Sequence, residues 1–439
     1  SGTEPDTSDG TNYSYHTCKP TYDLDGGGLD MWVKSFTVGP ISTSGHRNAI
    51  WIDGAGTFIP DDILPTPQFV GMNDPLTGAA PSESFWQGHV TTGSLTCSIK
   101  VQPGDEVYFV ASTGPFLTSS PKSTTVLADT FGVAKATITG MSPGTTYYTA
   151  AVVNGDLTAV TGSVTTVPIQ PSPIKFTLGS CRNTDTDNAI WTTMGEEDAD
   201  FFFHMGDIHY RDISTNSRAL FETGFDEPLN KPRQGAIYRS TASYYMFDDH
   251  DYGPNDSDGS SPSRQASLNT FRAKVPTPAL ATSGALSAVN YTFRRGKLVF
   301  AVLDLRSQRS GTDFLGPTQE AWFEGVVQSL ASDDFLCIVS TVPWIASSGS
   351  DTWYDASAQR ARLAQMVTDN CEGRAFIISG DMHALAFDDG TNSVGGIPVF
   401  HASPLTQNTS SKGGPYTIGP IRATNTQYGV VEFNSLGDT

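Results

Sequence analysis

The chain has 439 residues, which exceeds the size at which a single hydrophobic core stops growing, so two domains are expected. Its net charge is −20 with 26 Lys and Arg residues, which excludes a binder of nucleic-acid backbones, because such binding needs clustered cations. The acidic excess suits a solvating surface, and it also suits a site at which bound cations reverse the local charge.

Residues 1 to about 170 contain runs in which apolar and polar residues alternate, as they do in strands. Such runs cover 96–102, 106–112 and 145–153, and Pro-Gly and Asn-Gly turn signals separate them. This pattern is typical of a β-sandwich. We therefore predict an all-β, fibronectin-like or Ig-like domain over residues 1–170, with a proline-rich linker at 168–175.

From residue 171 onward, apolar strands alternate with helix-like stretches. The predicted strands cover 174–181, 201–207, 297–306, 335–344 and 374–381, and the predicted helices lie around 319–330 and 356–369. Apolar strand runs separated by helices favour buried sheets. Residues 171–439 are therefore predicted to form one α/β domain.

Residue types that bind metals stand at the ends of four predicted strands. They are Cys181, Asp207, the pair Asp249 and His250, and Asp381. Functional groups collect beyond the carboxyl ends of strands in such sheets, so these side chains are expected to converge. Tyr210 follows Asp207 by three residues, and His383 follows Asp381 by two, on the same side of an extended segment.

Each of these motifs alone also fits a structural role: a Gly-Asp turn before a core Tyr, a solvated acidic loop, or a His bonded to the backbone. Only eight His occur in the chain, and three of them fall in these motifs. Carboxylates crowded beside an apolar strand repel one another unless cations neutralise them. The clustering therefore favours a metal site.

The ordered set GSC, GDIHY, DDHDYGPND, LDLR, GDMHA, FHASPLT and QYGVVEF resembles the PhoD-like alkaline phosphatase and phosphodiesterase family of the calcineurin-like metallophosphoesterases, over residues 176–433. The resemblance implies a four-layer αββα metallophosphoesterase sandwich over 171–439, preceded by the all-β domain. It also implies a site that holds Fe(III) and one or more Ca(II) ions, with Zn or Mn as alternatives.

The resemblance assigns roles to individual residues. It implies Cys181, Asp207 and Tyr210 as iron ligands, with Asp207 as the bridge, and Asp249, Asp381 and His383 as further metal ligands. It implies His250 as the catalytic His, and Arg182 and Arg306 as phosphate contacts. Thiolate and phenolate ligands favour a trivalent transition metal, and carboxylates favour a hard cation such as Ca(II), which agrees with this assignment.

One residue departs from the family pattern. His209 lies inside GDIHY, where many relatives carry an apolar residue. It is therefore expected to touch the substrate or to replace a ligand, which leaves the division of ligands between the metals open.

The expected function is hydrolysis of phosphomonoesters and phosphodiesters by attack of a metal-bound hydroxide. His250, oriented by Asp251 or Asp248, would stabilise the transition state or protonate the leaving alkoxide. Small phosphate esters, including phospholipids and nucleotides, are the expected substrates. Two alternatives remain: a phosphodiesterase of the phospholipase D type with little monoesterase activity, and a non-catalytic secreted Ca-binding protein.

Several features favour export, either to the extracellular space or to the periplasm. The chain starts at Ser1, has no apolar run of about 20 residues, and carries sequons at Asn12, Asn255, Asn290 and Asn408. The five cysteines predict disulfides between Cys18 and Cys97 and between Cys337 and Cys371, with Cys181 left free. The sequence leaves the oligomeric state open.

Overall fold

The computed structural model describes residues 32–33, 84–114, 121–410, 412–422 and 424–434. Two sheets of the C-terminal region carry the candidate site. The first is five-stranded, in the order β1 (Trp32–Val33), β19 (Gly429–Asn434), β9 (Ile174–Gly179), β10 (Phe201–His204) and β11 (Ser243–Tyr245). Strands β9, β10 and β11 are parallel, whereas β19 runs antiparallel to β9 and to β1.

The second sheet is seven-stranded. Its order is β12 (Tyr291–Arg295), β13 (Leu298–Val302), β14 (Phe335–Ser340), β15 (Ala375–Ser379), β17 (Val399–Ala402), β16 (Leu385–Asp388) and β18 (Ile418–Ile421). The four central strands β13, β14, β15 and β17 are parallel, and the outer strands are antiparallel. These central strands are almost wholly apolar, as expected for a sheet that is covered on both faces.

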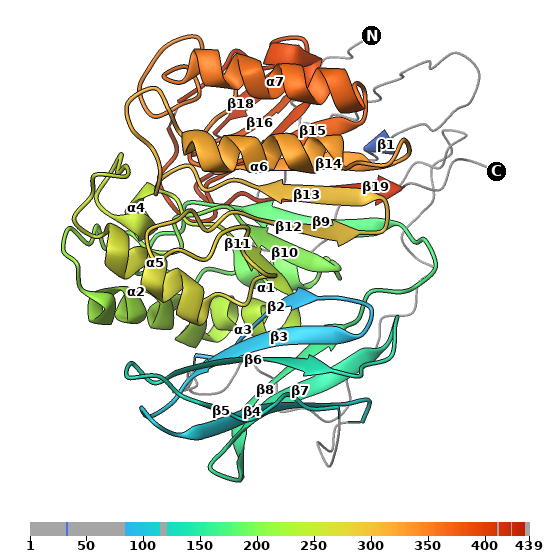
Figure 1. Cartoon of the computed structure of the whole chain (residues 1–439), viewed down its shortest axis with the longest axis vertical. Coiled ribbons are helices and arrows are strands. Elements are labelled where there is room, and N and C mark those ends of the chain that lie inside the picture. Colours follow the sequence, from blue (N-terminus) through green and yellow to red (C-terminus); the bar gives the residue numbers. More distant parts are fainter. Residues whose placement is uncertain (1–31, 34–83, 115–120, 411, 423, 435–439) are drawn as a thin grey trace, which may run out of the picture.

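A core rich in aromatic residues fills the space between the two sheets. The Phe293 and Phe300 rings stack at 4.3 Å between centroids, and Phe201 from the facing sheet meets Phe300 edge-on at 5.6 Å. Such pairs add to the free energy gained by burying the rings. The two sheets therefore lie face to face as the central layers of the domain (Figure 1).

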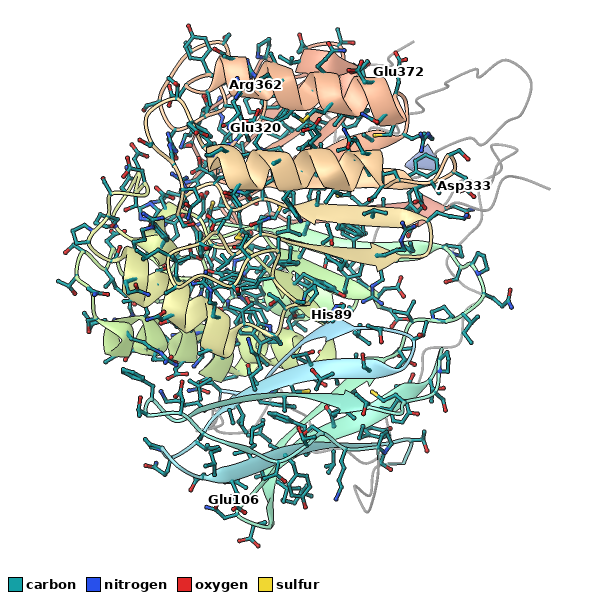
Figure 2. All side chains as sticks on the ribbon, in the orientation of Figure 1. His89, Glu106, Glu320, Asp333, Arg362 and Glu372 are labelled. Carbon is teal, nitrogen blue, oxygen red and sulfur yellow. The ribbon has the colours of Figure 1, made fainter. Side chains whose placement is uncertain are left out.

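Helices form the two outer layers. Helices α6 (Gly316–Gln328) and α7 (Ser357–Cys371) cover the seven-stranded sheet, and Glu320 and Arg362 join them through a bidentate ion pair (Figure 2). On the five-stranded side lie α1 (Ile190–Gly195), α2 (Arg218–Asn230), α3 (Pro232–Ser240) and α5 (Arg264–Lys274). This arrangement confirms the predicted four-layer αββα fold. None of the helices in the described ranges is long and apolar enough to span a bilayer.

Two antiparallel sheets precede this domain. One contains β2 (Trp86–Val90), β3 (Ser94–Lys100) and β6 (Val133–Thr139), and the other contains β5 (Val126–Leu127), β4 (Glu106–Ser112), β7 (Thr146–Val153) and β8 (Asp156–Thr165). Most of residues 1–83 lies outside the described part of the chain, and β1 belongs to the five-stranded sheet. The domain boundary at residue 170 therefore stays a prediction.

The two antiparallel sheets pack tightly against the αββα layers. Trp86 contacts Tyr238 and Tyr245 edge-on, and Lys135 donates to the carbonyl groups of Arg272 and Val275. A Cβ added at Gly88 would lie 2.2 Å from the Pro276 carbonyl oxygen, so only glycine allows this approach. One continuous apolar core runs through both parts.

The predicted disulfide between Cys337 and Cys371 is wrong. Both cysteines are free thiols, because they lie on opposite faces of the seven-stranded sheet. Cys337 faces the core between the sheets, whereas Cys371 ends α7 on the outer face. Side chains alternate between faces along a strand, and sequence proximity did not reveal this. Cys97 and Cys181 are also free thiols, and Cys18 lies outside the described residues.

The sequons differ in their exposure. Asn255 and Asn408 are exposed, whereas Asn290 is fully buried, so its amide is inaccessible to a glycan in the folded chain. Asn12 lies outside the described residues. Export stays a prediction.

Candidate metal centre

The predicted ligands converge because three parallel strands end at one edge of the two sheets. Cys181, Asp207 and Asp381 follow β9, β10 and β15, respectively. Glycines allow the strand ends to approach one another: a Cβ at Gly380 would lie 2.7 Å from Ser180 Oγ, and one at Gly206 would lie 2.4 Å from Asp248 Cβ. Close contact therefore requires glycine at both positions, and at Gly206 the positive φ of 87° favours it as well.

The site is built largely from residues in the left-handed region of backbone space. Nine described non-glycine residues have positive φ, and seven of them surround this centre: Cys181, Asp207, Asp212, Asp256, Asp351, Asp381 and His383. This conformation is unfavourable for residues with a Cβ, and it clusters at functional sites. These tight turns bring polar side chains from several loops together around the centre.

A first group of donors contains sulfur, nitrogen and oxygen. Atoms of Cys181, Asp207 and His383 all lie within 4.8 Å of one another. The Tyr210 hydroxyl donates to Asp207 Oδ2 at 2.8 Å and lies 3.0 Å from His383 Nε2, which places the phenol in the same group. His383 therefore belongs to the group that contains the thiol and the phenol, together with the shared carboxylate of Asp207.

A second group consists of oxygen donors alone. Carboxylate atoms of Asp207, Asp248, Asp249 and Asp381 lie within 4.8 Å of one another, and Asp207 belongs to both groups. Asp249, Asp256 and Asp351 form a further set at the same spacing. The α4 turn (Asp249–Tyr252), which follows β11, supplies Asp249.

Buried like charges make this arrangement unfavourable without cations. Burial, reinforced by neighbouring carboxylates, holds the pKa of Asp207 well above its usual range, and the same causes raise the pKa values of the Cys181 thiol and the Tyr210 phenol. Buried oxygen atoms of Asp248 and Asp249 have no hydrogen-bond partner. Buried carboxylate oxygens without a hydrogen-bond partner are stabilised by a bound cation. The two overlapping groups, one with soft and one with hard donor atoms, therefore fit a pair of cations that share Asp207.

His250 stands at the rim of the two groups. Its ring lies 4.1 Å from the Tyr210 ring between centroids, and its Nδ1 is 2.5 Å from Asp212 Oδ1. Burial lowers the pKa of His250, but Asp207, Asp249 and Asp212 outweigh burial and raise it to about 9. The residue that orients His250 is therefore Asp212, and neither Asp251 nor Asp248 has this role.

Asp251 has a structural position. It is the third residue of α4, and its carboxylate turns back to accept from the Asp248 backbone N–H at 2.6 Å in a capping box. It also accepts from the Ile208 backbone N–H and the Tyr245 hydroxyl. A fully buried carboxylate held by three donors cannot face His250, which corrects the expected catalytic role.

Arg306 is fully buried and engaged with carboxylates. Its Nε donates to Asp248 Oδ1 at 2.5 Å, and its two terminal nitrogens bind Asp351 at 2.6 and 2.9 Å. The buried guanidinium therefore neutralises and orients acidic side chains. Its expected role as a phosphate contact stays a prediction.

Arg182 and His209 also depart from their expected roles. Arg182 is fully buried and donates to the Thr186 carbonyl; burial lowers its pKa, opposed by Glu227 rather than by the metal-centre carboxylates. The His209 ring packs against α2, where a Cβ on Gly224 would lie 2.4 Å from Nε2. Both side chains contact residues outside the two donor groups: His209 meets Phe221 and Phe225 of α2, and Arg182 meets Thr186.

Sequence reasoning missed five acidic or basic residues at the centre. They are Asp212, Asp248 (in the role of a metal ligand), Asp256, Asp351 and Lys412. Apart from Asp248 they come from irregular loops, where no periodicity places side chains. For Asp248 and Asp256, their place inside the acidic motif DDHDYGPND could have indicated that they belong to the site.

The αββα fold places metal-ligand residue types at the ends of its strands. Its structure is similar to that of PhoD, with a TM-score of 0.62 and 16% identity, covering 80% of this chain and 79% of that chain. It is also similar to purple acid phosphatase PPD1 from yellow lupin (Lupinus luteus) seeds, with a TM-score of 0.55 and 12% identity, covering 80% and 67%. No family model and no curated protein sequence matches the chain. At these identities the likeness establishes the fold, and it confirms the predicted PhoD-like architecture.

Proposed function

We propose that the chain is a metal-dependent phosphoesterase that hydrolyses phosphomonoesters and phosphodiesters. The observation that carries the proposal is the pair of donor groups that share Asp207 at the edge of an αββα fold. PhoD and a purple acid phosphatase have this fold, which supports a phosphate ester as the substrate.

The two groups differ in the cation that they suit. Cys181, Tyr210 and His383 would hold Fe(III) together with Asp207, and the carboxylates of Asp248, Asp249 and Asp381 would hold Ca(II). Bound cations supply positive charge that activates water and neutralises phosphoryl oxygens.

The residues around the cations have distinct tasks. His250 lies against Tyr210, and its Nδ1 is held by Asp212, so its Nε2–H is free to donate a proton to the leaving alkoxide. Arg306 fixes Asp248 and Asp351 and thereby sets the orientation of the carboxylates. Bulk water is excluded from Asp207 by burial, which strengthens the electrostatic interactions there.

Chelation tests the dependence on metal. Metal-replete protein is expected to hydrolyse both 4-nitrophenyl phosphate and bis(4-nitrophenyl) phosphate, and a calcium chelator is expected to abolish both activities until Ca(II) is restored. Asp207→Ala serves as the inactive control, since both donor groups lose a member. Metal-replete protein that hydrolyses neither ester would refute the proposal.

The colour of the protein tests the identity of the first cation. A phenolate and a thiolate on Fe(III) give visible charge-transfer absorption, which Zn(II) and Ca(II) cannot give, so purified protein is expected to be coloured. Tyr210→Phe should shift or bleach the band, and Cys181→Ala should lower the iron content. Tyr354→Phe, at an exposed tyrosine, is the matched control and should leave the spectrum unchanged. Colourless, fully active protein with two zinc ions per chain would exclude the iron assignment.

A further inference from the structure

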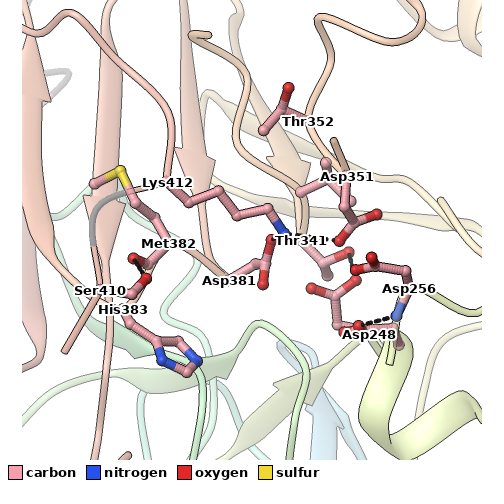
Figure 3. A network of polar contacts seen from close by, with 12 residues as sticks. Asp248, Asp256, Thr341, Asp351, Thr352, Asp381, Met382, His383, Ser410 and Lys412 are labelled. Atoms are coloured by element: carbon pink, nitrogen blue, oxygen red, sulfur yellow. Dashed lines mark hydrogen bonds and ion pairs between the residues drawn. The ribbon is translucent and has the colours of Figure 1, made fainter. Parts of the chain in front are cut away.

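Lys412 is a cation at the metal centre that the expected mechanism does not use. It lies in the loop after β17, and its ammonium contacts Asp351 Oδ2 at 2.9 Å and Asp381 Oδ2. Figure 3 shows its extended side chain reaching in to place the ammonium between these two carboxylates. The side chain is 25% exposed, so it reaches the centre from the solvent side.

The two arginines at the centre are held by carboxylates. Arg306 is fully buried and bound to Asp248 and Asp351. Arg309 is also bound to Asp351, and its guanidinium lies over the Phe314 ring at 4.0 Å. Among the described residues, Lys412 is therefore the partly exposed Lys or Arg side chain that touches a proposed metal ligand.

The charges around Lys412 indicate which of its two carboxylate partners it loses when cations bind to the centre. Asp351 keeps two arginine partners without it. A divalent cation at Asp381 neutralises that carboxylate and repels the ammonium, since like charges a few ångströms apart repel strongly at a partly buried site. Lys412 then needs a new anionic partner at the solvent side of the cations, where the substrate enters.

Resting on the proposed function, we propose that Lys412 is a substrate-binding residue whose ammonium donates to a non-bridging oxygen of the phosphoryl group. It exchanges Asp381 for the phosphate when cation and substrate are both present. Two glycines, Gly413 and Gly414, with positive φ follow Lys412 and give its loop a backbone that other residues rarely adopt.

Direct binding of inorganic phosphate tests this role. Wild type and Lys412→Met are loaded with metal, their metal contents are measured, and phosphate binding is followed by calorimetry. Lys412→Met is expected to weaken phosphate binding by about tenfold to a hundredfold at unchanged metal content, because one charge-assisted hydrogen bond is lost. Lys412→Arg should recover part of the affinity.

A matched control separates a local contact from the change in net charge. Lys297→Met removes one positive charge at the start of β13, at the opposite end of the strands, where Lys297 pairs with Asp333. It should bind phosphate like wild type. Equal phosphate affinity of Lys412→Met and wild type would overturn the inference. Wild type that binds phosphate but hydrolyses no ester would instead contradict the proposed function alone.

Discussion

Replacing His250 with alanine is expected to lower turnover by about 10² to 10⁴ while metal content stays unchanged, because we propose that the imidazole transfers a proton and is not a metal ligand. The geometry supports this assignment. Asp212 Oδ1 lies 2.5 Å from Nδ1 and fixes the ring, which packs at a tilt of 32° against the Tyr210 ring. Steady-state kinetics and metal analysis on the same preparations check the result.

The partner of His250 supplies the matched control. Asp212 is about half exposed, so Asp212→Asn should keep the fold and the metal while it loosens the ring. We expect a smaller loss of turnover than for His250→Ala. If His250→Ala lost metal as completely as Asp207→Ala, His250 would be a ligand instead, since its ring lies near Asp207 and Asp249.

Replacing Asp251 with alanine is expected to destabilise the fold by about 3 kcal/mol or more. Three donors lose their acceptor inside the protein: the N–H groups of Ile208 and Asp248, and the Tyr245 hydroxyl. Each buried unsatisfied donor costs about 1–3 kcal/mol. Denaturant unfolding of metal-free protein measures the loss without a contribution from bound cations.

Two further variants separate structure from chemistry at this position. Asp251→Asn keeps one acceptor oxygen and should be less destabilising than Asp251→Ala. Asp333→Ala removes an exposed carboxylate and should leave the unfolding midpoint close to that of wild type. An Asp251→Ala protein as stable as wild type but without turnover would restore the catalytic role expected from the sequence.

The fold and the principal donors could be predicted from the sequence because both depend on short-range patterns. Buried parallel strands are continuous apolar runs, and ligands stand immediately after them, as Cys181, Asp207 and Asp381 do. The order of the motifs then indicated the PhoD-like architecture, which the fold comparison confirms.

The remaining features depend on the direction in which a side chain points and on the paths of irregular loops. The spacing of residues in the sequence specifies neither. DDHDY forms a helical turn, so Asp251 points back to its own N-terminus. His209 lies two residues from Asp207 but faces α2, and Arg306 is surrounded by carboxylates from distant loops. The same limitation led to the wrong pairing of Cys337 with Cys371.

The left-handed residues around the centre have a consequence for selection and design. Each non-glycine residue in that conformation opposes folding by about 1 kcal/mol or more, and seven of them gather here. Selection for stability alone would fill these turns with glycine, as it does at Gly206. Side chains that can bind cations occupy these positions instead, so the metal-free chain is less stable here than it would be with glycine, and ligands that bind the folded state would offset this loss of stability. Stabilising this protein by consensus or glycine substitution would therefore erase its chemistry before it damaged its fold.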